Sequence, residues 1–82
     1  VGLLRLGMTA GDMGLMERAL LRVLEIDPDD ASAHWNLAVL YSEDPDAAGR
    51  SAAHARAAAR LMPELRPEAA RLLSYLEERD SQ

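Results

Sequence analysis

The 82-residue chain has no cysteine, no lysine and no phenylalanine, and it has only one tryptophan and two tyrosines. The absence of cysteine excludes a disulfide framework, thiol catalysis and cysteine-based zinc sites. Because aromatic residues are scarce and alanine is abundant, we expect a core of small and aliphatic side chains. Such a core suits closely packed helices better than sheets.

Positive charge is also scarce. The nine basic residues are all arginines, against fourteen acidic residues, which gives a formal net charge of −5. An acidic chain is repelled by nucleic-acid phosphates and by anionic lipid, so we expect neither a nucleic-acid partner nor direct membrane contact. No apolar run approaches the roughly 20 residues that cross a bilayer. The chain starts with Val1 in the middle of an apolar pattern, and we expect a longer chain before it.

Apolar residues recur at helical spacing in five blocks that are separated by glycine, proline or aspartate. The blocks span approximately 1–9, 13–26, 31–43, 47–62 and 67–79, with a turn at 10–12 between the first two. Asp30 is placed to cap the third block, and Pro67 stands in the first turn of the fifth. No block alternates with a period of two, so the sequence predicts an all-α fold with about five helices.

A shift of about 34 residues superposes one block on another, which indicates an internal repeat. This shift takes Leu3 to Leu37 and Leu6 to Leu40. We expect Leu37, Leu40 and Tyr41 to hold the stacked helices together. In the fourth block, alanines form a stripe that lets a neighbouring helix approach closely: Ala48, Ala52, Ala55 and Ala59.

Three places carry a recognisable pattern: Asn36-Leu37-Ala38 with Tyr41, the Gly11-Asp12 turn, and the stretch Leu24-Glu25-Ile26-Asp27-Pro28. In these places the chain resembles the tetratricopeptide repeat family. The resemblance implies a right-handed superhelical α-solenoid of antiparallel helix pairs in a single domain. It implies a truncated first repeat at 1–29, a second repeat at 30–64 and a C-terminal capping helix at 65–80. The chain departs from the family pattern in three places, at Pro45-Asp46, at His34 and at Met16.

Groups that suit catalysis or metal binding are few. The two histidines, His34 and His54, fall on different predicted helices and lack the His-x-x-x-His spacing of a zinc site. Asp30 and His34 are four residues apart, and we interpret them as a helix cap beside a packing histidine. The acidic run 27–30 lacks the glycine and the distal glutamate of a calcium loop. We therefore predict a protein that is not an enzyme and has no metal and no cofactor.

The first helix of each stacked pair lines the concave face of such a fold. The side chains predicted to contact a partner on this face are Arg5, Met8, Trp35, Asn36, Val39, Arg71 and Ser74. Trp35 is expected to contribute most, because tryptophan is enriched among residues that dominate binding energy. The alternative is that Trp35 packs into an adjacent helix. Arg5 and Arg71 suit contacts with acidic groups.

The sequence thus predicts a non-catalytic scaffold that binds a peptide segment or a partner protein in its concave groove. The alternative is a structural subunit of a larger assembly, with contacts through the open N-terminal end or the convex face. Some members of the family hold a C-terminal carboxylate on this face, and Asn36 and Arg71 match that pattern. Val1 and Pro67 stand where lysines are needed, so a complete clamp is not expected.

Pentatricopeptide repeats, which bind RNA, have a similar length and helix-pair form, but they need basic faces that this acidic chain lacks. The composition, rich in alanine and arginine and free of lysine, indicates a GC-rich bacterial coding sequence. It leaves the bacterial cytoplasm and periplasm as equal alternatives.

Overall fold

The computed structural model describes residues 10–80, and over that range its regular elements are all helical. The α-helices are α2 (Ala10–Ile26), α3 (Ala31–Ser42), α4 (Ala48–Leu61) and α5 (Arg66–Asp80), and two short 3-10 helices, η1 (Pro45–Ala47) and η2 (Pro63–Leu65), join the last three. The predicted all-α class is confirmed for this part of the chain. The block at 1–9, which is the first of the five expected helices, lies outside the described residues.

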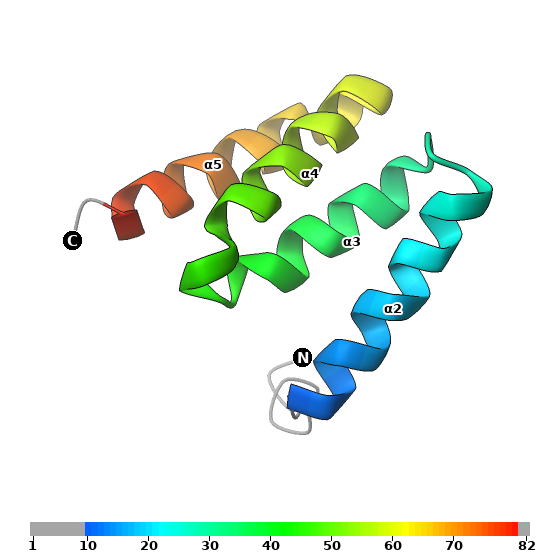
Figure 1. Cartoon of the computed structure of the whole chain (residues 1–82). Coiled ribbons are helices and arrows are strands. Elements are labelled where there is room, and N and C mark those ends of the chain that lie inside the picture. Colours follow the sequence, from blue (N-terminus) through cyan, green and yellow to red (C-terminus); the bar gives the residue numbers. More distant parts are fainter. Residues whose placement is uncertain (1–9, 81–82) are drawn as a thin grey trace.

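The four α-helices follow one another in a row, and each runs back along the one before it (Figure 1). α3 packs against α2 on one side and α4 on the other, and α4 in turn packs against α5. α2, the blue to cyan helix, stands at one end of the row and packs mainly against α3. α3 and α4 are therefore the central pair of the described helices, and α2 is the helix at one end of the row.

Local capping explains where the helices begin. Asp30 accepts a hydrogen bond of 3.0 Å from the backbone N–H of Ala33 at the start of α3, which confirms the predicted cap. Pro67 lies in the first turn of α5, where its missing N–H leaves no helical bond unmade. At the second break, Asp44 accepts from the N–H of Asp46 over 3.0 Å, and the chain forms η1 before α4.

The turn expected at 10–12 is wrong. Gly11 and Asp12 lie in the helix α2, whose described part is Ala10–Ile26, and do not form a loop. The two residues that resemble a family turn are thus part of a longer helix.

One part of the core lies between α2 and α3. Its buried residues are Leu37, Leu40, Tyr41 and Ala47, and the α2 side chains of Met13, Leu20 and Leu24 pack against them. Leu37 is fully buried. The expectation that Leu37, Leu40 and Tyr41 hold neighbouring helices together is confirmed for the described helices.

A second part of the core joins α3, α4 and α5 through small side chains. Ala38, Ala55 and Ala69 are its buried centre, and Trp35, Ala59, Leu72 and Leu73 pack around them. Small residues let helix backbones approach closely, and here each of the three helices supplies one alanine. Leu76 of α5 is also buried, whereas Arg71, Glu77 and Glu78 are exposed, so α5 has a polar outer face.

The buried side of α4 differs from the predicted alanine stripe. Ser51, Ala55 and Ala58 are fully buried, whereas Ala48, Ala52 and Ala59 are only half-buried. The helix is therefore rotated so that a serine enters the contact with α3. Its Oγ donates a hydrogen bond of 2.6 Å to the carbonyl oxygen of Ala38, which satisfies the buried hydroxyl. In the described part of the chain, the helices are too short or too polar to cross a membrane.

Candidate functional site

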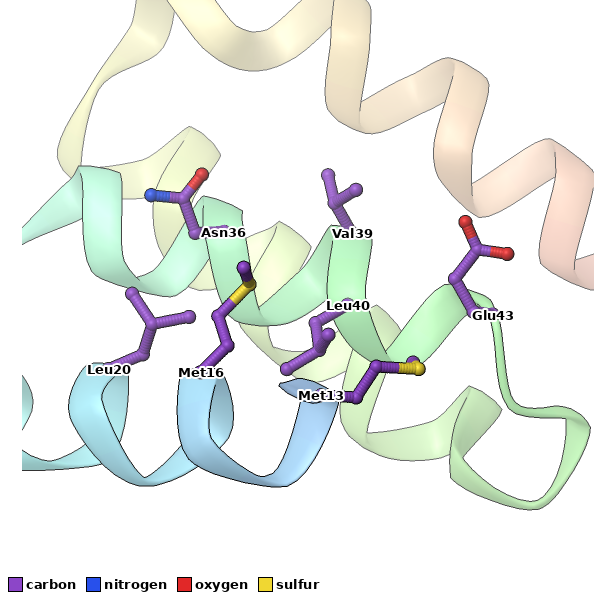
Figure 2. Close-up of a pocket in the computed structure, with 7 residues that line it drawn as sticks. All are labelled: Met13, Met16, Leu20, Asn36, Val39, Leu40 and Glu43. Atoms are coloured by element: carbon purple, nitrogen blue, oxygen red, sulfur yellow. The ribbon is translucent and has the colours of Figure 1, made fainter. Parts of the chain in front are cut away.

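An apolar groove of about 900 Å³ lies between α2 and α3 (Figure 2). Seven of the described residues line it, and all but Asn36 and Glu43 are apolar. They are Met13, Met16 and Leu20 from α2, Asn36, Val39 and Leu40 from α3, and Glu43 at the C-cap of α3. The lining residues recur every three or four positions, which places them on one side of each helix. The groove is thus a direct product of helical spacing on two adjacent segments.

The two walls of the groove have different side-chain arrangements. In Figure 2, the α2 side chains and Leu40 point into the space between the two helices, whereas Asn36, Val39 and Glu43 project from α3 away from α2. Leu40 is buried and forms the floor, while Met16 and Val39 are 44% and 42% exposed and form the rim. A ligand in the groove therefore meets exposed apolar side chains on both helices.

α2 also carries a second apolar stripe, on the side that α3 does not cover. Leu15 is 61% exposed and Ile26 is 81% exposed, and both lie on the same side of the helix as Ala19 and Val23. The spacing of 15, 19, 23 and 26 is the signal that identifies the second face.

The predicted contact residues fall in different places. Asn36 and Val39 line the groove. Trp35 is half-buried and packs against the cluster of Ala38, Ala55 and Ala69, which is where the alternative interpretation placed it. Arg71 and Ser74 are exposed on α5 and line a separate shallow hollow with Ala70, Tyr75 and Glu78. Arg5 and Met8 lie outside the described residues.

The structure brings together the two histidines that the sequence placed on separate helices. Nδ1 of His34 on α3 is 3.0 Å from Nδ1 of His54 on α4, and the ring centroids are 5.2 Å apart. Nε2 of His34 is 2.8 Å from the carbonyl oxygen of Pro28. Asp30 is a helix cap and His34 is a packing histidine, as interpreted from the sequence, because Asp30 accepts from the Ala33 N–H while the ring nitrogens of His34 contact Pro28 and His54. Within residues 10–80, no group of three or more metal-ligating side chains is assembled.

Tyr41 connects this histidine pair to α2. Its hydroxyl donates a hydrogen bond of 2.6 Å to Oε2 of Glu17, its ring centroid is 5.7 Å from that of His54, and the Arg50 guanidinium carbon lies 6.0 Å from the ring centroid. Burial, the hydrogen bond to Glu17 and the negative charge of Glu17 raise the pKa of Tyr41 to about 12. Burial, and then the neighbouring His34, lower the pKa of His54.

The arrangement therefore offers an apolar groove, a shallow polar hollow and a buried polar cluster. The groove is suited to holding an apolar side chain or helix, and the polar cluster links three helices. No family model, curated protein or solved structure matches the chain, so what the groove binds is argued from its own residues.

Proposed function

We propose that this chain is a helical-repeat module of the tetratricopeptide type, a right-handed α-solenoid of antiparallel helix pairs. Its proposed role is non-catalytic binding of a partner protein. Two features support the proposal: α3 and α4 pack as an antiparallel pair within 30–64, and α5 follows them with a polar outer face. In this proposal α3 and α4 are one repeat, α2 is the second helix of the preceding repeat, and α5 is the cap.

The observation that carries the binding role is the apolar groove between α2 and α3. Exposed apolar surface that is contiguous and concave marks interaction sites more often than scattered apolar residues do. Met16 and Val39 together present such a surface to solvent. Two of the lining side chains are methionines, whose flexible thioethers adapt to differently shaped apolar ligands.

We infer that the ligand is an amphipathic helical segment of a partner protein, with apolar residues at every third or fourth position and basic residues at one end. A helix laid in a groove between two helices is a common mode of peptide recognition. Glu43 lines one end of the groove, and the exposed Asp44 and Asp46 follow it. Among the described residues that line the groove none is basic, so complementary charge favours a basic end on the ligand.

Arg71 and Ser74 provide a second, smaller contact in this proposal. They are exposed on α5 and line the shallow hollow. A guanidinium suits a carboxylate of the partner, since it donates two parallel hydrogen bonds. The groove determines affinity and the Arg71 contact adds orientation.

Methyl NMR of the methionines tests the groove. The probe is a synthetic amphipathic helical peptide with a leucine stripe and a lysine-rich end, and the control peptide has glutamates at that end. We expect the methyl signals of Met13 and Met16 to shift saturably with the first peptide and much less with the second. Met62, at the C-terminal end of α4, is an internal reference whose signal stays in place.

Two matched variants sharpen this experiment. Val39→Asn removes an apolar side chain from the rim and is expected to weaken binding about tenfold, which is about 1.4 kcal/mol. Leu21→Asn changes a residue of similar exposure, 40% against 42%, that does not line the groove, and is expected to leave affinity unchanged. Equal effects of the two variants, or no shift at Met13 and Met16, contradict the proposal.

Other ligands of the groove give distinct results. If the Met13 and Met16 signals move when the chain alone is diluted, a second copy fills the groove. If they move when residues 1–9 are deleted, the chain's own N-terminal segment fills it. Either result assigns the groove to a ligand other than a partner protein and overturns this part of the proposal.

A second candidate function is that of a structural subunit, permanently built into a larger assembly. The outer stripe of α2 favours it, because Leu15 and Ile26 are large, apolar and more than half exposed. In this case the contact surface is the outer side of α2. Sedimentation velocity of the chain distinguishes the two, since a monomer that stays soluble at high concentration contradicts a permanently buried stripe. If Ile26→Lys leaves the affinity for the peptide unchanged, the outer stripe of α2 is not part of the peptide-binding groove.

A further inference from the structure

The protonation of the histidine pair follows from its neighbours. The carbonyl oxygen of Pro28 only accepts hydrogen bonds, so Nε2 of His34 carries the hydrogen and donates it over 2.8 Å. A neutral His34 then has a lone pair on Nδ1. Nδ1 of His54, 3.0 Å away, must therefore carry a hydrogen and donate it to His34. The two rings form one directed chain from His54 through His34 to the loop before α3.

We propose that His34 and His54 form an acid-sensitive latch that fastens α4 to α3 and opens when both rings are protonated. The proposal is independent of the partner-binding role. The latch joins three segments, because Pro28 lies in the turn between α2 and α3, His34 is on α3 and His54 is on α4. Loss of the contact between His34 and His54 is therefore expected to loosen both the α3–α4 pair and the turn before α3.

The latch tolerates one added proton but not two. A proton added at Nε2 of His54 leaves the bond from its Nδ1 to His34 intact. A further proton must go to Nδ1 of His34, which is the atom that accepts this bond. Two N–H groups and two positive charges then face each other across 3.0 Å, so the rings must separate. The second protonation, and not the first, is the step that opens the contact.

The groups around the pair come from four segments. Asp30, at the start of α3, is engaged as the cap for the Ala33 N–H, and Asp27 and Asp29 flank Pro28 and are exposed. Tyr41 on α3 lies beside His54, with Glu17 of α2 on its hydroxyl and Arg50 of α4 over its ring. Glu17 already accepts the Tyr41 hydrogen bond, and Arg50 adds a positive charge on the same helix as His54.

The direction in which stability changes with pH follows from comparing the pKa of histidine in the folded and the unfolded chain. Histidine in an unfolded chain titrates near 6.5. Burial and the neighbouring His34 lower the pKa of His54 in the fold, so below about pH 6.5 the unfolded chain holds more protons and stability falls as pH falls. His34 and His54 are the only histidines and the chain has no cysteine, so other side chains contribute little between about pH 6 and pH 8.

The first test is a titration of the unmodified 82-residue chain. Two-dimensional NMR of the imidazole nitrogens, in buffer with a chelator, reports the tautomer and protonation of each ring. We expect the Nε2–H form for His34 and the Nδ1–H form for His54 at about pH 8. On acidification we expect two separate steps, and loss of amide-exchange protection in α4 only with the second. Two identical, independent titrations at the position of an unfolded peptide overturn the proposal, and no variant has to fold for that result.

A double-mutant cycle provides the second test. His34→Gln, His54→Gln and the double variant are compared with the unmodified chain by thermal unfolding at about pH 8 and about pH 5. We expect the melting temperature of the unmodified chain to fall on acidification, and that of the double variant to fall much less. The coupling between the two positions is expected to be present at the higher pH and lost at the lower. Equal coupling at both pH values means that the pair is not a latch.

Discussion

Ser51 of α4 donates its hydroxyl hydrogen to the backbone carbonyl oxygen of Ala38 of α3 over 2.6 Å, and both residues are fully buried. A hydroxyl on this side of α4 therefore bonds directly to the neighbouring backbone, which requires the two helices to lie close together. Ala38 and Ala55 make that approach possible, because neither side chain extends beyond a methyl group. The central helix pair thus depends on small residues and one buried hydrogen bond.

Removing this hydrogen bond is expected to destabilise the fold measurably. Ser51→Ala keeps the space nearly unchanged but leaves the bond unmade, which costs about 1 kcal/mol in free energy of unfolding. Urea denaturation followed by circular dichroism measures the loss. Ser74→Ala is the control, since Ser74 is exposed on α5 and its replacement changes stability by less than about 0.5 kcal/mol. Equal stability of the two variants means that the bond to Ala38 contributes nothing.

Enlarging a side chain in the same contact is expected to cost more. Ala55 is fully buried between three helices, so Ala55→Leu overfills the contact and destabilises by about 1–3 kcal/mol. Ala53→Leu places the same side chain on the exposed side of α4 and serves as the matched control. The same denaturation experiment compares them. Similar stabilities of the two variants indicate that α3, α4 and α5 separate without cost, which contradicts close packing.

The ends of most helices were predictable because their signals are local. The Asp27-Pro28 and Pro63 breaks, the Asp30 cap and the position of Pro67 depend on one or two residues and on backbone geometry. The rotation of α4 was not predictable in the same way. Alanine occurs at so many positions of α4 that the apolar pattern does not define a single face, and the buried side was decided by packing of Ser51.

Of the side chains predicted to contact a partner, Asn36 and Val39 line the groove and Trp35 does not, and the reason is again geometric. Trp35 and Asn36 are adjacent, and one residue turns a helix by about 100°. This turn places Trp35 on the alanine cluster and Asn36 in the groove. The contact between His34 and His54 spans twenty residues between two helices, and the spacing within one helix gives no signal for it. Only the packing of α3 on α4 shows it.

Tyr41 is expected to ionise far above the usual range for tyrosine. Burial and the contact with Glu17 raise its pKa to about 12. Ultraviolet titration of a Tyr75→Phe variant, in which Tyr41 is the sole tyrosine, measures this midpoint. Glu17→Gln removes the negative charge that opposes ionisation, and is expected to lower the midpoint. No change in that variant means that burial alone determines the pKa.

The same shift gives a stability prediction at high pH. An unfolded tyrosine ionises near 10, so between about pH 10 and pH 12 the unfolded chain loses a proton that the folded chain retains. The contribution of Tyr41 is complete below about pH 10 and is lost as pH rises towards 12. Denaturation at increasing pH is therefore expected to show a steeper loss of stability in the Tyr75→Phe chain than in a Tyr41→Phe, Tyr75→Phe chain.

Replacing Trp35 is expected to change the stability of the fold but not the affinity for a peptide, because Trp35 packs in the core and does not line the groove. The side chain packs half-buried against Ala55 and Ala69 and is absent from the groove lining. Trp35→Ala is expected to lower the free energy of unfolding by about 2 kcal/mol, below the range for a fully buried tryptophan. Under conditions where the variant stays folded, its affinity for the basic amphipathic peptide is expected to change by less than about twofold.

Tryptophan fluorescence of the unmodified chain tests whether Trp35 contacts the peptide. Trp35 is the only tryptophan, so its emission reports unfolding directly and is expected to stay constant while the Met13 and Met16 methyl signals shift with peptide. An emission shift that saturates with peptide, together with a tenfold loss of affinity in Trp35→Ala and little loss of stability, contradicts this assignment. In that case Trp35 contacts the partner, and the contact surface extends from the groove across α3 to the side that faces α4 and α5.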